Sequence, residues 1–383
     1  MLHIGIDGHN LEAERTGVGR YLENLLKEFT KMPELRNQVR FTIYFKGDAP
    51  SDDFLKDSMF NVRSLKKSTR GSFALYFSVI LPFNAWRDKV DILWFPGYMV
   101  PYSWIWPSAV VLHDIIFERY PSSVPPLHRF MYRIFGKYGA QHSEKVFTVS
   151  EYSKQEINAL YGVNEDKIIV TPLGIDKKFK VLENKEIQEK IKNKYDIEKK
   201  YMLYLGQIFN RRHVPETMKA FARIANEFPD YQLLVVGKNR TQPFIDIDKM
   251  AKDLNDVAGR NIILRTEYVP EEDMVPLYNG ARIGFYISDY EGFGLPPLEM
   301  LACGTPVLAP ATTSLKTTLQ GEQVIIEDPE DVQEIAYKLK RTLLDERYLE
   351  KMKERGPEYA AQFTWDKTAK KTIEAFLDTS REK

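Results

Sequence analysis

The sequence contains a single cysteine, Cys303, so no disulfide can form within the chain. Cys303 stands between Ala302 and Gly304, a setting more typical of a small buried residue than of a reactive thiol. The chain also lacks a surplus of charge, because Lys plus Arg (54) equals Asp plus Glu (54). Without a global basic field, nucleic acid is not expected to be the main partner.

Long hydrophobic runs are missing as well. The longest apolar stretch, residues 72–86, is shorter than the ~20 residues that cross a bilayer, and it contains Pro82. The chain runs from Met1 straight into an apolar segment, without the succession of charged, apolar and small residues of a secretory signal. We therefore expect a cytoplasmic chain. Clusters of His, Cys or Asp with metal-ligand spacing are also lacking, and no bound metal or other cofactor is expected.

What the chain does contain is an alternation of strand and helix patterns. Its 383 residues exceed one ordinary domain, and the length favours two. Short apolar strands separated by helical segments are typical of parallel α/β layers. The strands expected in the first half are residues 2–6, 41–45, 91–95, 109–112, 145–149 and 168–171. Those expected in the second half are residues 201–205, 232–236, 261–264, 283–287, 306–308 and 323–326.

The second half repeats the opening of the first. A strand at 2–6 is followed by a glycine-bearing loop and by a helix at 19–29, whose apolar residues recur at i, i+3, i+4 and i+7. A strand at 201–205, a polar loop at 206–213 and a helix at 215–224 follow in the same order. A Lys- and Glu-rich stretch before residue 200 fits a solvated helix and a connection between the halves.

This repetition predicts an α/β fold of two doubly wound parallel sheets. We place the first domain at residues 1–175 and the second at 176–364, with a final helix at 365–380. Two such sheets facing each other would leave a cleft at the carboxyl ends of their strands, where these folds bind ligands.

Residues 291–299 read Glu-Gly-Phe-Gly-Leu-Pro-Pro-Leu-Glu and follow an expected buried strand. Gly292 and Gly294 let the backbone approach a ligand closely, and the two prolines suit a first helical turn. The amides around Gly294 and Leu295, with the positive end of the helix dipole, would favour an anion such as a phosphate. We place Glu299 in that first turn, able to accept hydrogen bonds from ribose hydroxyls, and Glu291 across the loop. The alternative is that Glu299 only caps its helix and that Glu291 is a solvated loop acid.

Together with residues 300–307, Met-Leu-Ala-Cys-Gly-Thr-Pro-Val, this segment resembles the signature of retaining glycosyltransferases of family 4, which use nucleotide-diphosphate sugars. The resemblance implies the GT-B architecture, with a last helix that packs back on the first domain. It implies that Glu291 lies beside the donor sugar and that Glu299 binds the nucleotide ribose. We include Phe293, Gly294 and Leu295 with the donor-binding residues.

The loop that starts at Gly206 carries two adjacent arginines. The leaving diphosphate gains charge as the glycosidic bond breaks, so cations must neutralise it. Arg212, with Arg211 beside it, is the best candidate, because a guanidinium binds phosphate oxygens in a fork. The family usually has lysine at the place of Arg212 and often arginine at that of Gln207, so Gln207 is a departure. The alternative is that both arginines are surface charges.

Gly206 and Gln207 of this loop are assigned to the donor, and so are three further residues. Tyr268 and Val269 follow the strand expected at 261–264, where the family resembled holds the nucleobase with backbone groups and an apolar wall. Lys238 follows the strand at 232–236 and lies near the donor or is simply solvated.

The first half contributes a second glycine loop and a histidine. Residues 16–21, Thr-Gly-Val-Gly-Arg-Tyr, resemble the N-terminal loop of the family, especially its mannosyltransferase branch acting on polysaccharides. There, glycines at the places of Gly17 and Gly19 line the cleft near the donor phosphate and the acceptor. His113 follows the strand at 109–112, and the resemblance implies that it touches the donor sugar or the acceptor. From its chemistry alone it donates a hydrogen bond to a sugar hydroxyl, relays a proton, or is structural.

The sequence thus predicts a retaining transferase that moves a hexose, mannose from GDP-mannose, onto a glycan or lipid-linked glycan in cell-surface polysaccharide synthesis. The alternatives are a UDP-sugar transferase, a GT-B-type nucleotide-sugar epimerase and a catalytically weak sugar-nucleotide-binding scaffold. Peripheral contact with the inner face of the membrane is also considered, because a basic amphipathic helix can rest on anionic lipid. The cations concerned are Arg63, Lys66, Lys67, Arg70, Arg129, Arg133 and Lys137. A helix packed on the first sheet explains the apolar residues of these segments equally well.

Overall fold

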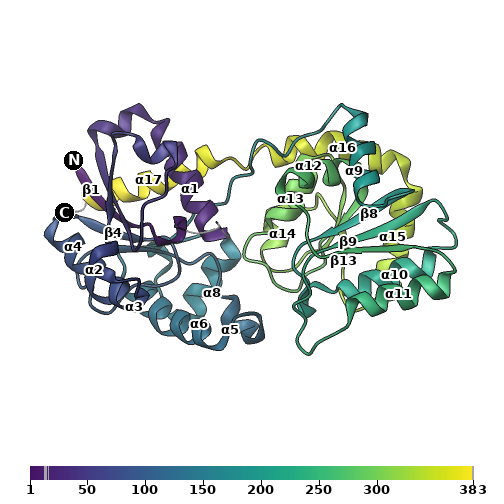
Figure 1. Ribbon diagram of the computed structural model, residues 1–383, viewed down its shortest axis with the longest axis horizontal. Helices are drawn as coiled ribbons and strands as arrows, with labels where there is room; N and C mark the ends of the chain where they lie inside the picture. Colours follow the sequence, from purple (N-terminus) through teal and green to yellow (C-terminus); the bar gives the residue numbers. More distant parts are fainter. Residues whose placement is uncertain (13–14, 16, 382–383) are drawn as a thin grey trace. The chain divides into compact units, whose positions relative to one another are not determined.

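A computed structural model describes residues 1–12, 15 and 17–381 of the chain. The chain divides into two compact units, the first formed by Met1–Gly174 with Thr364–Lys383 and the second by Ile175–Phe363. Each unit contains its own parallel sheet (Figure 1). The predicted α/β fold class of two Rossmann-like domains is confirmed.

The sheet of the first unit has seven strands in the order β3-β2-β1-β4-β5-β6-β7, all paired in parallel. Its strands are β1 (Leu2–Asp7), β2 (Val39–Phe45), β3 (Phe60–Ser64), β4 (Ile92–Phe95), β5 (Ser108–Val111), β6 (Lys145–Thr148) and β7 (Ile168–Val170). The helices of this unit are α1 (Gly17–Thr30), α2 (Lys66–Thr69), α3 (Phe73–Leu75), α4 (Leu81–Arg87), α5 (Ile116–Arg119), α6 (Pro126–Met131), α7 (Lys137–His142), α8 (Glu151–Tyr161) and α17 (Trp365–Arg381). Two π-helical turns, η4 (Tyr76–Ile80) and η6 (Tyr132–Gly136), join helices of this set.

Side chains of the first sheet alternate between two cores. In β4, Ile92 and Trp94 belong to one cluster of buried residues, whereas Leu93 and Phe95 belong to another. Successive side chains of a strand point to opposite faces, so this sheet is buried on both sides. That burial explains why its central strands read as continuous apolar runs in the sequence.

The last helix completes the first of these cores. Ala369, Ile373 and Phe376 of α17 are buried in the same cluster as Ile4 and Leu22. Helix α17 packs against α1 and is the yellow helix beside the purple one in Figure 1. The first unit therefore owes part of its core to a segment that follows the second unit in the chain.

The sheet of the second unit has six parallel strands in the order β10-β9-β8-β11-β12-β13. They are β8 (Lys200–Leu205), β9 (Tyr231–Val236), β10 (Ile263–Thr266), β11 (Ala281–Phe285), β12 (Val307–Pro310) and β13 (Val324–Ile326). The helices are α9 (Lys185–Lys194), α10 (Val214–Ile224), α11 (Ile247–Ala258), α12 (Glu271–Gly280), α13 (Leu295–Ala302), α14 (Thr313–Leu319), α15 (Val332–Leu344) and α16 (Glu346–Ala360). The order reverses between β8 and β11, and doubly wound sheets bind ligands at such a point.

Two simpler expectations can be compared with the structure. Cys303 is buried, as predicted, and burial raises the pKa of its thiol to about 12. Within the described residues, no helix is both long and apolar enough to span a bilayer. The strand β3 was not predicted from the sequence.

Candidate active site

The loop after β8 approaches the end of β9 very closely. Gly206 and Gly237 both have positive φ angles, +151° and +142°. A Cβ atom on Gly237 would lie 1.8 Å from the carbonyl oxygen of Gly206, which no side chain can tolerate. The two glycines therefore fix where the chain leaves the sheet and where the arginine-bearing loop begins.

Glu291 is the centre of the site in the second unit. Its carboxylate Oε1 accepts hydrogen bonds from Arg211 Nη1 at 2.8 Å, from Arg212 Nε at 3.1 Å and from Ser288 Oγ at 2.9 Å. The side chain is only 11% exposed, and the two arginine side chains are 8% and 13% exposed. Glu291 is thus no solvated loop acid, and neither arginine is a surface charge.

The charges of this cluster support one another. Burial alone would raise the pKa of Glu291, but the charges of Arg212 and Arg211 hold that pKa below its ordinary value. Burial would likewise lower the pKa of Arg212, and the charge of Glu291 raises it instead. Glu291 and Arg212 therefore both stay ionised at neutral pH.

Arg212 is held in place by further contacts. Its Nη1 donates to the carbonyl of Gln207 at 3.1 Å, and its Nη2 donates to Tyr286 Oη at 3.1 Å. The guanidinium also lies over the ring of Tyr286, 5.3 Å from the centroid. Gln207 contributes this backbone oxygen, while its side chain is exposed.

The glycine segment forms the start of α13. Gly294 is the N-cap in a left-handed conformation with φ of +92°, and prolines stand in the first turn, as predicted. A Cβ on Gly294 would lie 2.5 Å from a methyl carbon of Leu315, which would have to shift, and the left-handed φ itself favours glycine. Leu295 opens the helix and is partly exposed. Phe293 is buried instead and packs edge-on against Phe363, with ring centroids 5.9 Å apart.

The prediction for Glu299 needs one correction. It is the fifth residue of α13, so it lies in the second turn and not in the first. The helix begins at Leu295 because Gly294 is left-handed, and the sequence did not fix that start. Tyr278 Oη donates to Glu299 Oε2 at 3.4 Å, so the carboxylate has a neighbour from α12.

The three remaining donor candidates lie at the ends of neighbouring strands. Lys238 lies two residues after the end of β9, next to Gly237, and its side chain is exposed. Tyr268 follows β10 and is 74% exposed, whereas Val269 beside it is buried. The exposed ring of Tyr268 and the apolar Val269 therefore follow the carboxyl end of a strand in the same sheet as β8, the strand that Arg212 follows.

In the first unit, His113 follows β5. Its ring donates a hydrogen bond to the carbonyl of Pro96, and its Nε2 atom is buried without a partner among the described residues. The ring meets Tyr21 edge to face, with centroids 4.8 Å apart. Burial lowers the pKa of His113 to about 4, so the ring is neutral at pH 7. Because the one N–H of the neutral ring is used by Pro96, Nε2 is available as an acceptor, and the role of His113 toward a sugar stays a prediction.

The two glycines of the first loop differ in their surroundings. A Cβ on Gly19 would lie 2.5 Å from the carbonyl oxygen of Asn10, whereas a Cβ on Gly17 would meet nothing within 4 Å. Gly19 is thus required by packing inside its own unit, and Gly17 is exposed at the start of α1. Thr16, which opens the segment of resemblance, lies outside the described residues.

Several partners of the site were not predicted from the sequence. His213 has a positive φ of 43° and is buried, and its Nε2 pairs with Asp289 Oδ1 at 2.7 Å. Thr313 Oγ1 accepts from the backbone N–H of Glu291 at 3.2 Å, and Ser314 Oγ donates to its carbonyl at 2.7 Å. His213 thus contacts the Glu291 loop through Asp289, and Thr313 and Ser314 contact the backbone of Glu291.

The environment of His113 predicts a pH effect on stability. An unfolded histidine titrates near 6.5, and the folded one near 4. Between these values the unfolded state binds more protons, so His113 destabilises the fold as pH falls from 6.5 to 4, by up to about 3 kcal/mol. We expect the His113→Gln variant to lose less unfolding free energy than the parent over this range, measured by urea unfolding. The exposed His142 provides the control, and an H113Q slope equal to that of H142Q would contradict the assignment.

Two family models match the chain one after the other. The model described as Glycosyltransferase Family 4 matches residues 15–179, and the model described as Glycosyl transferases group 1 matches residues 185–359. The first match ends at residue 179, a few residues inside the second unit, which begins at Ile175, and the second match lies wholly within that unit. The chain belongs to the family 4-like glycosyltransferases with the GT-B fold.

Individual relatives agree with this class. The O-antigen chain mannosyltransferase B of Escherichia coli is 28% identical over 380 residues, covering 94% of this chain and 96% of that protein. The serotype-specific mannosyltransferase WbdA of Escherichia coli is 26% identical over 286 residues, covering 72% of this chain. The match spans 34% of WbdA, about a third of its length. Sucrose-phosphate synthase from Thermosynechococcus elongatus shares the fold, with a TM-score of 0.73, 16% identity and 100% coverage of both chains.

Proposed function

We propose that this chain is a retaining transferase that moves mannose from GDP-mannose onto a glycan or lipid-linked glycan in the synthesis of cell-surface polysaccharide. The observation that carries the proposal is the buried Glu291 carboxylate between Arg211 and Arg212, directly before the N-terminus of α13. The names of two relatives, both mannosyltransferases, support the choice of sugar. No metal ion is invoked, because two guanidinium groups and a helix N-terminus provide the positive charge.

The diphosphate of the donor would be bound by Arg212 and by the backbone N–H groups at the start of α13. A guanidinium has five N–H groups, and the contacts of Arg212 to Glu291, Gln207, Tyr286 and the Tyr204 hydroxyl use four of them. One remains for a phosphate oxygen, and the fixed guanidinium adds its charge at the same place. The helix dipole adds to this attraction at the same place.

Glu291 would orient the sugar through its second oxygen. The three side-chain hydrogen bonds described above all end on Oε1, which leaves Oε2 to accept from a sugar hydroxyl. The same carboxylate fixes the two arginines, so one residue would position both the sugar and the cations. Glu299 would accept from the ribose hydroxyls, and Tyr268 and Val269 would border the base.

In the transfer step, the bond between the sugar C1 and the diphosphate oxygen breaks, and a bond between C1 and the acceptor oxygen forms. Retention requires the acceptor to approach from the face that the diphosphate leaves. The leaving phosphate oxygen takes the acceptor's proton, so the products are the glycosylated acceptor and GDP. The protein supplies positioning and charge stabilisation, which Arg212 provides as negative charge develops on the diphosphate. His113 would accept a hydrogen bond from a hydroxyl through its neutral Nε2.

The direct test is a screen of nucleotide sugars with detection of released GDP or UDP. Slow donor hydrolysis reveals the preferred donor without knowledge of the acceptor, and thermal shifts with GDP and UDP report on the base. We expect GDP-mannose to give the largest release. Turnover of UDP-sugars alone would show that the donor is a UDP-sugar and not GDP-mannose. Conversion of a nucleotide sugar to its epimer would indicate an epimerase. Binding without turnover would indicate a scaffold.

Contact with the membrane is proposed as part of this function, at a surface of the first unit. Phe83, Trp86, Ile105 and Trp106 are exposed there, and the rings of Trp86 and Trp106 lie 6.4 Å apart. Tryptophan side chains prefer the interface between lipid and water. Of the basic residues considered from the sequence, Arg63, Lys66 and Arg133 are ion-paired to carboxylates within the unit, so they add less attraction than expected.

The two tryptophans provide the test of membrane contact. We expect the double variant Trp86→Ser/Trp106→Ser to bind vesicles of phosphatidylglycerol and phosphatidylcholine about tenfold more weakly than the parent, because apolar burial is lost. Cosedimentation at low salt measures this. Phe244→Ser removes an exposed aromatic from the second unit and serves as the control. Absence of vesicle binding by the parent at low salt would reject the proposal.

A further inference from the structure

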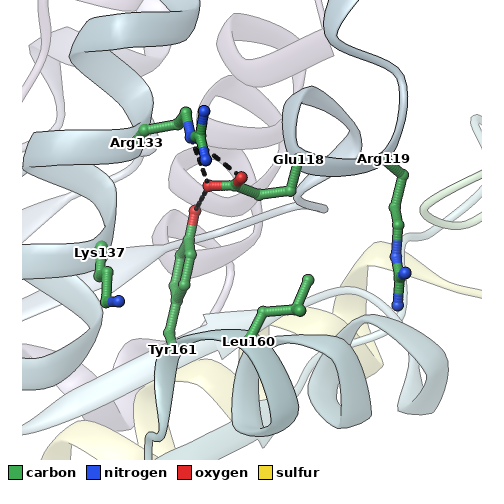
Figure 2. A pocket seen from close by; sticks show the side chains of 6 residues that line it. All are labelled: Glu118, Arg119, Arg133, Lys137, Leu160 and Tyr161. Carbon is green, nitrogen blue, oxygen red and sulfur yellow. Dashed lines mark hydrogen bonds and ion pairs between the residues drawn. The ribbon is translucent and has the colours of Figure 1, made fainter.

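The first unit contains a basic cavity with no part in the site described above. It has a volume of about 330 Å³ and is lined by Glu118, Arg119, Arg133, Lys137, Leu160 and Tyr161. Figure 2 shows these side chains around the pocket, from α5, from the turn η6 with α7 and from the end of α8, with Lys137 and Arg119 on opposite sides. At about 30 Å³ per water molecule, the cavity has room for roughly ten, more than a single small ion needs.

One side of the cavity is fixed by a hydrogen-bonded triad. Arg133 Nε lies 3.0 Å from Glu118 Oε2, and Tyr161 Oη donates to Glu118 Oε1 at 3.1 Å (Figure 2). Burial, followed by the charge of Glu118, raises the pKa of Tyr161, so the phenol keeps the proton that it donates. The negative charge of Glu118 is therefore already matched by Arg133.

The other cations leave a positive surplus. Arg119 pairs with Glu156, which lies outside the cavity lining, through Nε at 2.8 Å. Lys137 makes no ion pair with any of the described residues, and Figure 2 shows it apart from the triad. Arg119 and Arg133 thus have carboxylate partners, and Lys137 provides the surplus positive charge of the lining.

The geometry of the backbone also sets this cavity apart. Arg133 lies in the π-helical turn η6, and Lys137 begins α7 immediately after it. Such wide turns are rare and are frequently found at functional sites. Leu160 adds an apolar surface beside the cations, which are otherwise suited only to a small anion.

We infer that this cavity binds a phosphate monoester, with the phosphate on Lys137 and Arg133 and the organic part against Leu160. A phosphate monoester carries about −1.5 to −2 charges at pH 7, enough to match the unpaired charge of Lys137. A neutral sugar would leave Lys137 unmatched, and a bare ion would leave most of the volume empty. The ester is either a soluble compound or the headgroup of a lipid, since both present the same phosphate.

The probe for the soluble ester is methyl phosphate, titrated into the full chain by calorimetry. All proteins in this comparison carry Arg212→Met, so that phosphate binding to the second unit is weakened equally. We expect Lys137→Gln to weaken methyl phosphate binding about tenfold, the loss of one charge-assisted contact. Lys67→Gln makes the same charge change on α2, outside the cavity, and should leave binding unchanged. Binding should also weaken as salt increases.

The probe for the lipid is a vesicle containing phosphatidic acid, whose headgroup is a phosphate monoester. Weaker binding of Lys137→Gln to both methyl phosphate and these vesicles, relative to Lys67→Gln, identifies the lipid source. Weaker binding to methyl phosphate alone identifies a soluble ester. Equal affinities of the two variants for methyl phosphate overturn the inference. Neither probe contains a sugar nucleotide, so the result is independent of the proposed transferase activity.

Discussion

Replacing Glu291 with alanine is expected to lower transfer, or donor hydrolysis, by roughly 10²–10³-fold, as the loss of one preorganised electrostatic group does in other enzymes. The reason lies in the double role of the carboxylate. One of its oxygens accepts hydrogen bonds from Arg211 and Arg212, and the other would accept from the sugar. Without it, Arg212 loses the partner that fixes its Nε, and the diphosphate loses a cation in a defined position.

The same substitution should destabilise the second unit. Glu291→Ala leaves two buried guanidinium groups without their carboxylate, and breaking a buried ion pair costs about 3–5 kcal/mol. Glu291→Gln keeps an oxygen acceptor at Oε1 and should recover part of this stability but little activity, because the charge is absent. Urea unfolding and released nucleotide measure the two effects separately.

A matched control distinguishes catalysis from folding. Glu322 is also a buried carboxylate of the second unit and pairs with Arg355, outside the motif. Glu322→Ala should lose stability yet retain the donor turnover of the parent at a temperature where it is folded. If Glu291→Ala also retained that turnover, the catalytic assignment of Glu291 would be wrong and the scaffold alternative would be favoured.

Gly237→Ala is expected to destabilise the second unit about as much as Glu291→Ala does. Its Cβ would lie 1.8 Å from the carbonyl oxygen of Gly206, and its φ of +142° is a conformation that side chains rarely adopt. Strain of about 1–3 kcal/mol and overpacking of about 1–3 kcal/mol add here, so we expect a loss of roughly 4 kcal/mol in the free energy of unfolding. Any remaining folded protein should have a displaced arginine loop and reduced donor binding.

The control for this variant separates conformation from collision. Gly259 also has a positive φ, +67°, but a Cβ there would meet nothing within 4 Å. Gly259→Ala should therefore cost only about 1–2 kcal/mol, the penalty of a left-handed alanine. Equal losses for the two variants in urea unfolding would show that the close approach of Gly206 and Gly237 is not as tight as described.

Most of the fold could be predicted because it depends on local patterns. Buried parallel strands are apolar runs, and helices such as α1 place their apolar residues on one face. Strand β3 was not predicted because it lies at the edge of its sheet, where Asn61, Arg63 and Ser64 are polar and partly exposed. An edge strand needs apolar residues on fewer sides, so its pattern is weaker.

The site could be predicted only as separate pieces. Adjacent arginines and a glycine segment are visible in the sequence, but their meeting is not, because Arg211 and Glu291 are 80 residues apart. The burial of Arg211 depends on Ser288 and Tyr290, whose contacts no local spacing encodes. The neutral tautomer of His113 likewise depends on the carbonyl of Pro96, a backbone atom that the sequence does not distinguish.

The return of α17 to the first unit has a consequence for synthesis on the ribosome. Phe376 contacts Trp94 and Phe147, with ring centroids 5.4 and 5.2 Å away, yet it follows Gly174 by about 200 residues. At about 5–20 residues per second, the nascent first unit waits roughly 10–40 s for the helix that closes its core. During that interval an apolar groove is open to chaperones, so the unit translated first becomes complete only after the second has emerged.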